Sequence, residues 1–333
     1  MRIVCNSKNS EAACAIFYRD ALSNLKELTV CDYDHYNGYD IALFMTYRND
    51  LEDMKAAKLD YPHLKTGIID ARASWVEEFL PYADFLILDS IEMKDFWASA
   101  RKPIFFYLEY PNIANAKKKH EAKQPIIIGY HGNKVHLHTM YETVTPALEE
   151  LAQTYPVELW VMYNIEKLGQ WEWNVPKGLK VRHIQWREEH FHQELAHVDI
   201  GISPNCVPIL NEKKLKKKAE SRKLREHFVY SDDDYFLRFK MPSNAGRITI
   251  WGKLGIPVVA DLTPAACQCI QDGENGLLAY SQEGWYRALE TLILRADLRQ
   301  RYAENMKQTI AHKYDFTIQN QKFLEFLKSE IIT

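Results

Sequence analysis

The chain lacks the features that mark membrane-spanning, disulfide-rich and nucleic-acid-binding proteins. In 333 residues, no apolar run approaches the roughly 18 residues that cross a bilayer. Its six cysteines are scattered without a C-x-x-C pair, so we expect reduced thiols and no zinc site of that type. A formal net charge of −3 gives no general reason to expect nucleic acid. The N-terminal segment turns polar after Cys5, too early for a signal peptide, and we expect a cytoplasmic protein.

Short apolar runs alternate with helical patterns along both halves of the chain, which is typical of an α/β protein. Continuous apolar runs separated by helices indicate parallel sheets that helices cover on both faces. The expected strands are Arg2–Cys5, Leu28–Cys31, Ile41–Met45, Thr66–Asp70, Phe85–Asp89 and Pro103–Phe106, then Pro125–Tyr130, Val157–Met162, Lys180–Ile184, Ile200–Ser203 and Ile256–Ala260. Helices expected between them include Ser74–Leu80, Glu92–Ala100, Leu137–Gln153 and Glu188–Ala196.

A polar, basic segment divides these two series of strands. We expect an N-terminal domain at residues 1–115, a linker at 116–124 and a C-terminal domain at 125–312. The last segment, 313–333, has an apolar stripe of phenylalanines and predicts a helix that crosses back to the first domain.

The segment 239–278 (FKMPSNAGRITIWGKLGIPVVADLTPAACQCIQDGENGLL) carries the most specific local signals. Ser243 or Asn244 can cap a helix with a side-chain oxygen, and Gly255 is suited to end that helix. A buried strand follows. Thr263 is then suited to be the N-cap of a second helix, and Pro264 to be its first residue.

The start of the helix after Asn244 predicts an anion site. Free backbone N–H groups and the helix dipole favour negative charge there, and Lys240, Ser243, Asn244 and Arg247 surround it in sequence. A diphosphate is the natural ligand. The alternative is a pair of solvated cations beside a helix.

The sequence "GIPVVADLTPAACQCIQDGENGLLA" resembles the C-terminal signature of GT-B glycosyltransferases, especially retaining family 4. This resemblance implies two Rossmann-like domains whose parallel sheets face each other across a cleft. It also implies a nucleotide-sugar donor on the C-terminal domain, an acceptor on the N-terminal domain and no tightly bound cofactor. Many members carry two glutamates eight residues apart in this helix, where this chain has Pro242 and Ile250. The contacts of those glutamates therefore do not transfer, and retention is favoured only weakly.

Four further residues are candidates for the nucleotide site. Gly129, His131 and Gly132 end the first strand of the second domain, where glycines let a backbone approach phosphate closely; a plain strand-to-helix turn is the alternative. Trp186 follows another strand end and is positioned to stack on a base or to pack internally.

Glu109 and Asp70 are the candidates for catalytic base. Each lies at the carboxyl end of an expected strand, where functional groups of α/β proteins concentrate. A base there would deprotonate an acceptor hydroxyl. Carboxylates at strand ends are also common helix caps, so a structural role is the alternative. The pairs His136/His138 and His190/His192 have no completing carboxylate, and we expect no metal site.

The resemblance, with the candidate anion site, implies a glycosyltransferase that moves a sugar from a UDP-, GDP- or other nucleotide sugar to a glycan or lipid-linked acceptor. We expect a role in bacterial-type surface polysaccharide or glycolipid synthesis. Two alternatives remain open. A GT-B sugar-nucleotide epimerase needs acidic and histidine groups in its cleft, and a non-catalytic nucleotide-sugar binder keeps the fold without the chemistry.

The segment Lys213–Arg225 suggests a peripheral membrane contact, because it carries eight basic residues. A solvated basic helix is the alternative. If the segment docks on lipid, co-sedimentation of the protein with vesicles will rise with anionic lipid and fall with added salt. Equal pelleting with neutral and anionic vesicles would contradict the prediction.

Overall fold

The computed structural model describes residues 1–6, 13–31, 35–46, 50–71, 74–205 and 245–332. Chain contacts divide it into two compact units. Unit 1 comprises residues 1–114, 244–250 and 308–333, and unit 2 comprises residues 115–243 and 251–307. In the part of the chain that the structure describes, no helix is long and apolar enough to cross a membrane.

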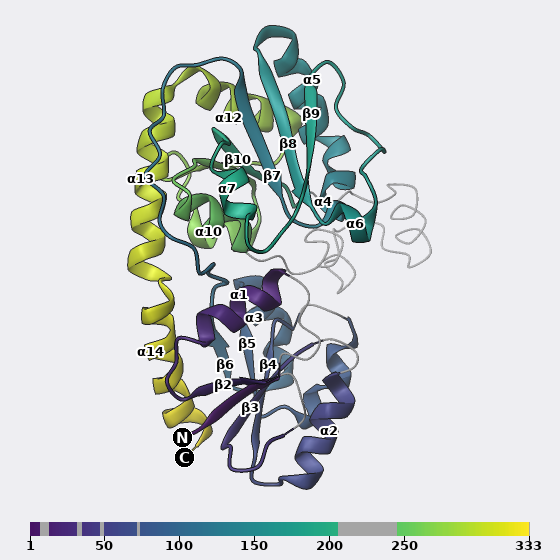
Figure 1. The fold of residues 1–333 in the computed structure, drawn as a ribbon, viewed down its shortest axis with the longest axis vertical. Coiled ribbons are helices and arrows are strands. Elements are labelled where there is room, and N and C mark those ends of the chain that lie inside the picture. The colour runs from purple at the N-terminus through teal and green to yellow at the C-terminus, as the bar shows by residue number, and fades with distance from the viewer. Residues whose placement is uncertain (7–12, 32–34, 47–49, 72–73, 206–244, 333) are drawn as a thin grey trace, which may run out of the picture. The chain divides into compact units, whose positions relative to one another are not determined.

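Unit 1 is built on a six-stranded parallel sheet with the order β2-β1-β3-β4-β5-β6 (Figure 1). The strands are β1 (Ile3–Asn6), β2 (Leu28–Cys31), β3 (Ile41–Met45), β4 (Lys65–Ile69), β5 (Phe85–Leu88) and β6 (Ile104–Phe106). Each lies within two residues of its expected position. Residues of β1, β3 and β5 are wholly buried, as a sheet covered on both faces requires.

The helices of unit 1 differ from expectation in two places. Residues 74–82 form two 3-10 turns, η1 (Ser74–Glu78) and η2 (Leu80–Tyr82), instead of one α-helix, and Pro81 near the start of η2 prevents continuation. The helix expected at Glu92–Ala100 is α3 (Ile91–Phe96), which tightens into η3 (Trp97–Ala100). The remaining helices are α1 (Ala13–Leu22), α2 (Asp50–Asp60) and α14 (Phe316–Phe326), with a π turn at Leu327–Ile331.

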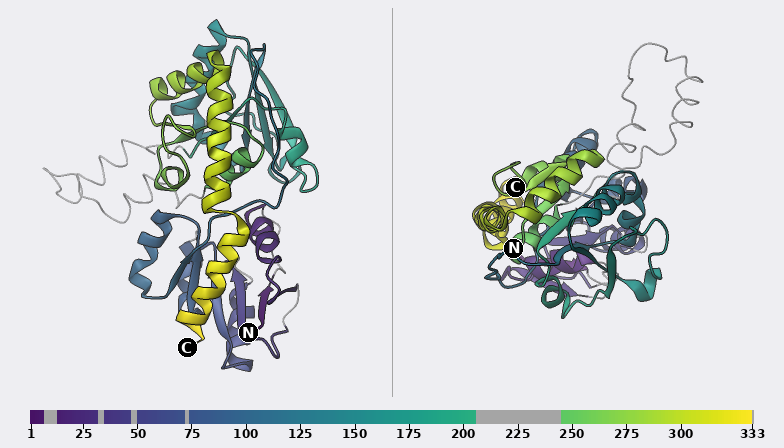
Figure 2. Two further views of the ribbon diagram at one scale, coloured as in Figure 1. Left: turned by 90° about the vertical axis from the view of Figure 1, so that its left-hand side faces the viewer. Right: turned by 90° about the horizontal axis from the view of Figure 1, so that it is seen from above.

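Helix α14 packs on the sheet of unit 1, as the yellow ribbon of Figure 2 shows. Its buried Phe323 lies 5.2 Å from Phe105 and 6.4 Å from Phe85, measured between ring centroids. Asn320 accepts a 2.8 Å hydrogen bond from the Tyr107 hydroxyl and donates to the carbonyl of Ala21. The last helix is thus part of the core of unit 1.

Unit 2 has a second six-stranded parallel sheet, with the order β12-β11-β10-β7-β8-β9. Its strands are β7 (Ile126–His131), β8 (Val157–Tyr163), β9 (Lys180–Gln185), β10 (Ile200–Ser203), β11 (Val258–Asp261) and β12 (Leu277–Ala279). Together with unit 1, this confirms the expected fold class of two Rossmann-like α/β units.

The helices of unit 2 include one further correction. The helix expected at Leu137–Gln153 is broken into α4 (Lys134–Thr139), the turn η4 (Met140–Glu142) and α5 (Val144–Thr154). Pro146 explains the break, because it has no N–H for the carbonyl of Glu142 and its ring would clash there. The others are α6 (Ile165–Leu168), α7 (Phe191–Leu195), α10 (Gly246–Lys253), α11 (Pro264–Cys269), α12 (Gln282–Leu294) and α13 (Ala296–Lys313). Of these, α10 and α13 contribute residues to both units.

The signals of the segment 239–278 are confirmed from Gly246 onward. Gly255 has a φ of +66°, and the N–H of Ile256 donates to the carbonyl of Trp251, which is the Schellman end of α10. Thr263 caps α11 by accepting from the N–H of Ala266, with Pro264 in the first turn. The end of α10 at Gly255 and the start of α11 at Thr263 and Pro264 are therefore as the sequence predicts.

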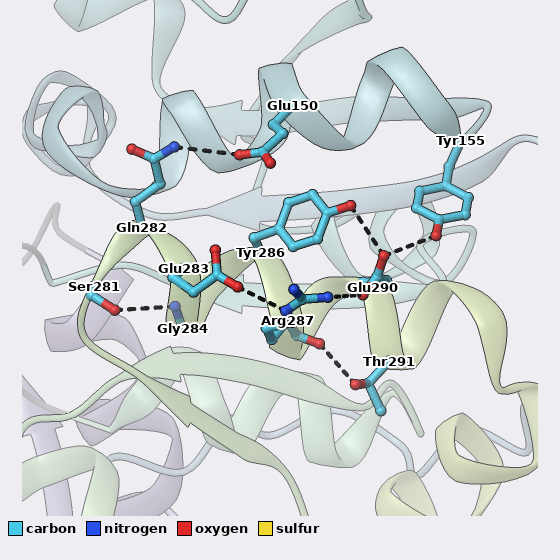
Figure 3. A network of polar contacts seen from close by, with 10 residues as sticks. All are labelled: Glu150, Tyr155, Ser281, Gln282, Glu283, Gly284, Tyr286, Arg287, Glu290 and Thr291. Carbon is cyan, nitrogen blue, oxygen red and sulfur yellow. Dashed lines mark hydrogen bonds and ion pairs between the residues drawn. The ribbon is translucent and has the colours of Figure 1, made fainter.

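Hydrogen bonds of Tyr155 to Glu290 and of Gln282 to Glu150 link α12 to α5 and its C-terminal end (Figure 3). Ser281 caps α12 by accepting from the N–H of Gly284. Glu290 accepts hydrogen bonds from the Tyr155 and Tyr286 hydroxyls, and Arg287 bonds to both Glu283 and Glu290. Solvent screens such surface pairs, so the helix is stabilised mainly by its buried face, where Trp285 has 0% exposure.

The connection at residues 115–124 is held by buried polar contacts within unit 2. His120 Nε2 lies 2.8 Å from the carbonyl oxygen of Gly255. Burial, with lesser effects of Lys118 and Arg299, lowers the pKa of His120 to about 4, although Asp199 and the Gly255 carbonyl oppose this. The folded protein therefore holds His120 neutral, with Nε2 as the donor.

This lowered pKa predicts acid sensitivity of the fold. Below the ordinary histidine value the unfolded chain binds a proton that the folded chain excludes, so His120 should lower the free energy of unfolding by about 2 kcal/mol between about pH 7 and about pH 4.5. Urea unfolding at the two pH values measures this loss. His120→Gln keeps a donor for Gly255 and removes the titration, so its loss should be smaller; equal losses would contradict the assignment.

Candidate functional site

The segment that follows β6 positions the first candidate, Glu109. Gln319 of α14 holds the preceding residue through both backbone groups: it accepts from the N–H of Leu108 at 2.7 Å and donates to its carbonyl at 3.0 Å. Burial and the charge of Asp315 raise the pKa of the flanking phenols, Tyr107 and Tyr110, so both remain protonated. The backbone around Glu109 is therefore fixed before any ligand binds.

The side chain of Glu109 lies against the first turn of α10, within unit 1. A Cβ placed on Gly246 would be 2.5 Å from the Glu109 carboxyl carbon and 2.7 Å from each of its oxygens. The Thr249 hydroxyl donates to the Glu109 carbonyl at 3.0 Å. With any other residue at position 246 the Glu109 side chain would have to move, and in its present place the buried carboxylate lies where the helix dipole favours negative charge.

The second candidate base, Asp70, follows β4 in an unusual backbone conformation. Its φ is +59°, in the left-handed region that few non-glycine residues adopt, although aspartate tolerates it better than most. Its N–H donates to the carbonyl of Ile87 at 3.0 Å, and its carbonyl accepts from the Thr46 hydroxyl at 3.0 Å. Neighbouring strands therefore hold Asp70 at the carboxyl edge of the sheet, 9% exposed.

The carboxyl edge of the sheet in unit 2 holds His131. Its ring meets Trp251 of α10 edge-on, with centroids 4.7 Å apart. Gly132 follows with a φ of +139°, which glycine adopts freely, and its N–H donates to Met162. Packing explains Gly129, because a Cβ at this position would lie only 2.5 Å from a methyl carbon of Val198. Whether these three residues contact a ligand stays a prediction.

Sequence reasoning missed two polar residues at the same edge. Ser203 ends β10 beside β7, and its hydroxyl is buried without a hydrogen-bond partner among the described residues. Asp261 ends β11, where it accepts from the N–H of Asn205 at 2.5 Å and from the Trp285 indole at 3.0 Å. The available signal was a polar residue directly after an apolar strand, the same signal that singled out Asp70.

Trp186, expected near a nucleobase, follows β9 in unit 2. Its ring stacks on Phe191, with centroids 6.3 Å apart and planes inclined by 26°. It remains half-buried. One face therefore has an internal packing partner, and a stacking role toward a base stays a prediction.

Three of the predicted anion-site residues, Lys240, Ser243 and Asn244, lie outside the described residues, as does the basic segment Lys213–Arg225. Arg247 is described: it is the second residue of α10 and is buried, at 9% exposure. Within the described ranges, no group of three or more histidine, cysteine, aspartate or glutamate side chains is placed to hold a metal ion.

Comparison with known proteins identifies the fold. No protein-family model matches the sequence, and no curated protein does. Among solved structures, HepE from Anabaena, in complex with UDP, has a TM-score of 0.65 at 14% identity, over 99% of this chain and 100% of HepE. A trehalose-phosphate synthase from Burkholderia xenovorans gives 0.62 at 11% identity, over 98% of this chain and 99% of the synthase.

A third similar structure extends well beyond the length of this chain. TarM from S. aureus, in a complex that contains UDP, has a TM-score of 0.60 at 11% identity, over 86% of this chain. The chain spans 55% of TarM. At these identities the likeness establishes the fold, and the two Rossmann-like units have the GT-B fold.

The positions of the two carboxylates predict different effects on nucleotide affinity. If a diphosphate binds at the first turn of α10, Glu109 repels it, so Glu109→Gln should tighten nucleoside diphosphate binding about three- to tenfold. As a control, Asp70→Asn removes the charge of the other candidate carboxylate and should leave the affinity for nucleoside diphosphate unchanged. Calorimetric titration of both variants with UDP measures this difference. Weaker binding by Glu109→Gln would place the diphosphate elsewhere.

Proposed function

We propose that the protein is a glycosyltransferase that moves a sugar from a nucleotide-sugar donor to a hydroxyl group of a glycan or lipid-linked acceptor. The observation that carries the proposal is the first turn of α10 in a GT-B fold, where the buried residue Arg247 follows a glycine that packs against the Glu109 carboxylate. HepE and TarM were each solved with UDP, which supports a uridine nucleotide as the first donor to test.

The donor diphosphate binds at this first turn, in the proposed mechanism. Backbone N–H groups, Arg247 and Lys240 stabilise the negative charge that develops on the departing nucleotide, which is the main electrostatic demand of glycosyl transfer. Ser243 and Asn244 supply further hydrogen bonds. The donor domain comprises residues 125–312 and the acceptor domain residues 1–115, as the resemblance to family 4 implies.

The location of Glu109 bears on the choice of base. In an inverting displacement the acceptor attacks the sugar on the face opposite the leaving group, so the base must lie away from the diphosphate. Glu109 lies against the turn proposed for that diphosphate, with its carboxyl carbon 2.5 Å from the point that a Cβ on Gly246 would occupy. Asp70 is therefore the better candidate for an inverting base, whereas the Glu109 carboxylate lies close enough to the proposed diphosphate to repel it.

A retaining reaction needs neither carboxylate as a base, because a donor phosphate oxygen can accept the acceptor proton. Resemblance to family 4 favours retention weakly. Ile250, which replaces a family glutamate, is buried at 3% exposure and supplies no polar contact to the sugar. The product anomer will decide between the two routes.

The proposed cellular setting is the synthesis of a surface polysaccharide or glycolipid at the cytoplasmic face of a membrane. It depends on the basic segment Lys213–Arg225.

The competing functions are a sugar-nucleotide epimerase and a nucleotide-sugar binder that catalyses no reaction. An epimerase converts the donor without releasing nucleotide, and a pure binder changes nothing, so assay of a donor panel separates all three.

Removal of the positive charges provides the test of the donor site. Lys240→Ala and Arg247→Ala should each weaken UDP binding by about 1–3 kcal/mol, as lost charge-assisted hydrogen bonds do. Calorimetry with UDP, GDP, ADP, CMP and dTDP first identifies the nucleotide, and circular dichroism checks folding. Lys322→Ala, an exposed cation on α14, is the matched control. Unchanged affinity in both test variants would remove the assignment.

A further inference from the structure

An exposed aromatic cluster lies on unit 2, on segments that carry none of the candidate site residues. Four of the large apolar side chains that are exposed among the described residues come from two adjoining segments: Val135, Tyr141, Leu168 and Trp173. The ring of Trp173 lies 5.3 Å from that of Tyr141 and 5.8 Å from that of His138. Trp173 is 55% exposed, which is unusual for so large an apolar group.

The segment that carries Trp173 is anchored to α4 by a single lysine. Lys134 Nζ donates to three consecutive carbonyl oxygens, those of Leu168 at 2.7 Å and of Gly169 and Gln170 at 3.0 Å each. The C-terminal end of α6 is consequently held near the start of α4. An ammonium group that satisfies three carbonyls fixes the loop against the helix.

A second anchor fixes Trp173 itself. Trp171 is buried in the core of unit 2 at 1% exposure, and its indole donates to the carbonyl of Trp173 at 2.6 Å. The next residue, Asn174, has a φ of +55°, so the chain turns sharply there. Contacts with the core of unit 2 therefore hold the backbone at Trp173 in place, while its ring faces solvent. Because the loop is already ordered, it loses little conformational entropy when a ligand binds to the ring.

We infer that Trp173, Tyr141 and His138 form a saccharide-binding platform. The C–H groups on one face of a pyranose are apolar and slightly positive, and they match the electron-rich face of an indole ring. The tilted neighbouring rings give the platform side walls, with planes at 58° and 41° to Trp173. Exposed polar groups beside it, Glu142 and Asn174, can bond to sugar hydroxyls.

The surrounding charge favours a neutral saccharide over a membrane. Glu142 accepts from the Tyr141 hydroxyl at 2.6 Å, and the exposed residue Glu172 directly precedes Trp173 in the chain. Two carboxylates repel an anionic lipid surface but accept hydrogen bonds from sugar hydroxyls. Saccharide binding itself needs no nucleotide, so this inference stands apart from the proposed function.

Titration of the full chain with maltohexaose, cellohexaose and chitohexaose, followed by tryptophan fluorescence and calorimetry, tests the platform. We expect at least one of these probes to bind without nucleotide, and Trp173→Ala to weaken that binding about tenfold or more. Tyr141→Ala should weaken it as well, whereas Tyr141→Phe keeps the ring and most of the affinity. Tyr280→Ala removes an exposed aromatic elsewhere on unit 2 and should change nothing.

Several results would overturn the inference. They are the absence of binding to all three probes, equal affinity in Trp173→Ala, vesicle pelleting that depends on Trp173, or self-association that Trp173→Ala abolishes. Donor hydrolysis measured in parallel keeps this test separate from the proposed function. Saccharide binding without hydrolysis of any donor would leave the platform intact and remove the transferase.

Discussion

The close approach of the Glu109 carboxylate to Gly246 is the constraint on which the candidate site depends. Any side chain at position 246 would have to occupy the space of that carboxylate, because a Cβ would lie 2.5 Å from it. The contact joins the segment after β6 to the first turn of α10. Through Gln319, the same segment is bonded to α14. A strand end, a helix start and the last helix are thus fixed together within unit 1.

This arrangement places positive and negative groups on one helix turn. The helix dipole favours an anion there, and Glu109 already supplies one. A diphosphate proposed for the same turn would need compensating cations, and Arg247, the second residue of α10, is one candidate. Glu109 and the first turn of α10 lie together in the fold, although in sequence they are more than a hundred residues apart.

In both units, polar residues lie at the carboxyl ends of the parallel strands. Parallel strands bring their carboxyl ends to one edge, so residues that directly follow apolar runs meet there. Asp70 and Glu109 occupy this edge in unit 1, and His131, Ser203 and Asp261 occupy it in unit 2. The aromatic platform at Trp173 arises differently, from a loop that Lys134 and Trp171 anchor.

The amino-acid sequence by itself determined the strands and the caps of this protein, because both depend on neighbours in the chain. Apolar runs located β2, β3 and β10 to the residue, and Gly255, Thr263 and Pro264 act as their types require. Glu109 and Asp70 were identified as strand-end residues for the same reason. Only the tertiary structure decided that Glu109 meets Gly246, that Gly129 makes room for Val198, and that Trp173 is exposed while Trp171 is buried. Those facts depend on contacts between distant segments, and no local pattern of residues records such contacts.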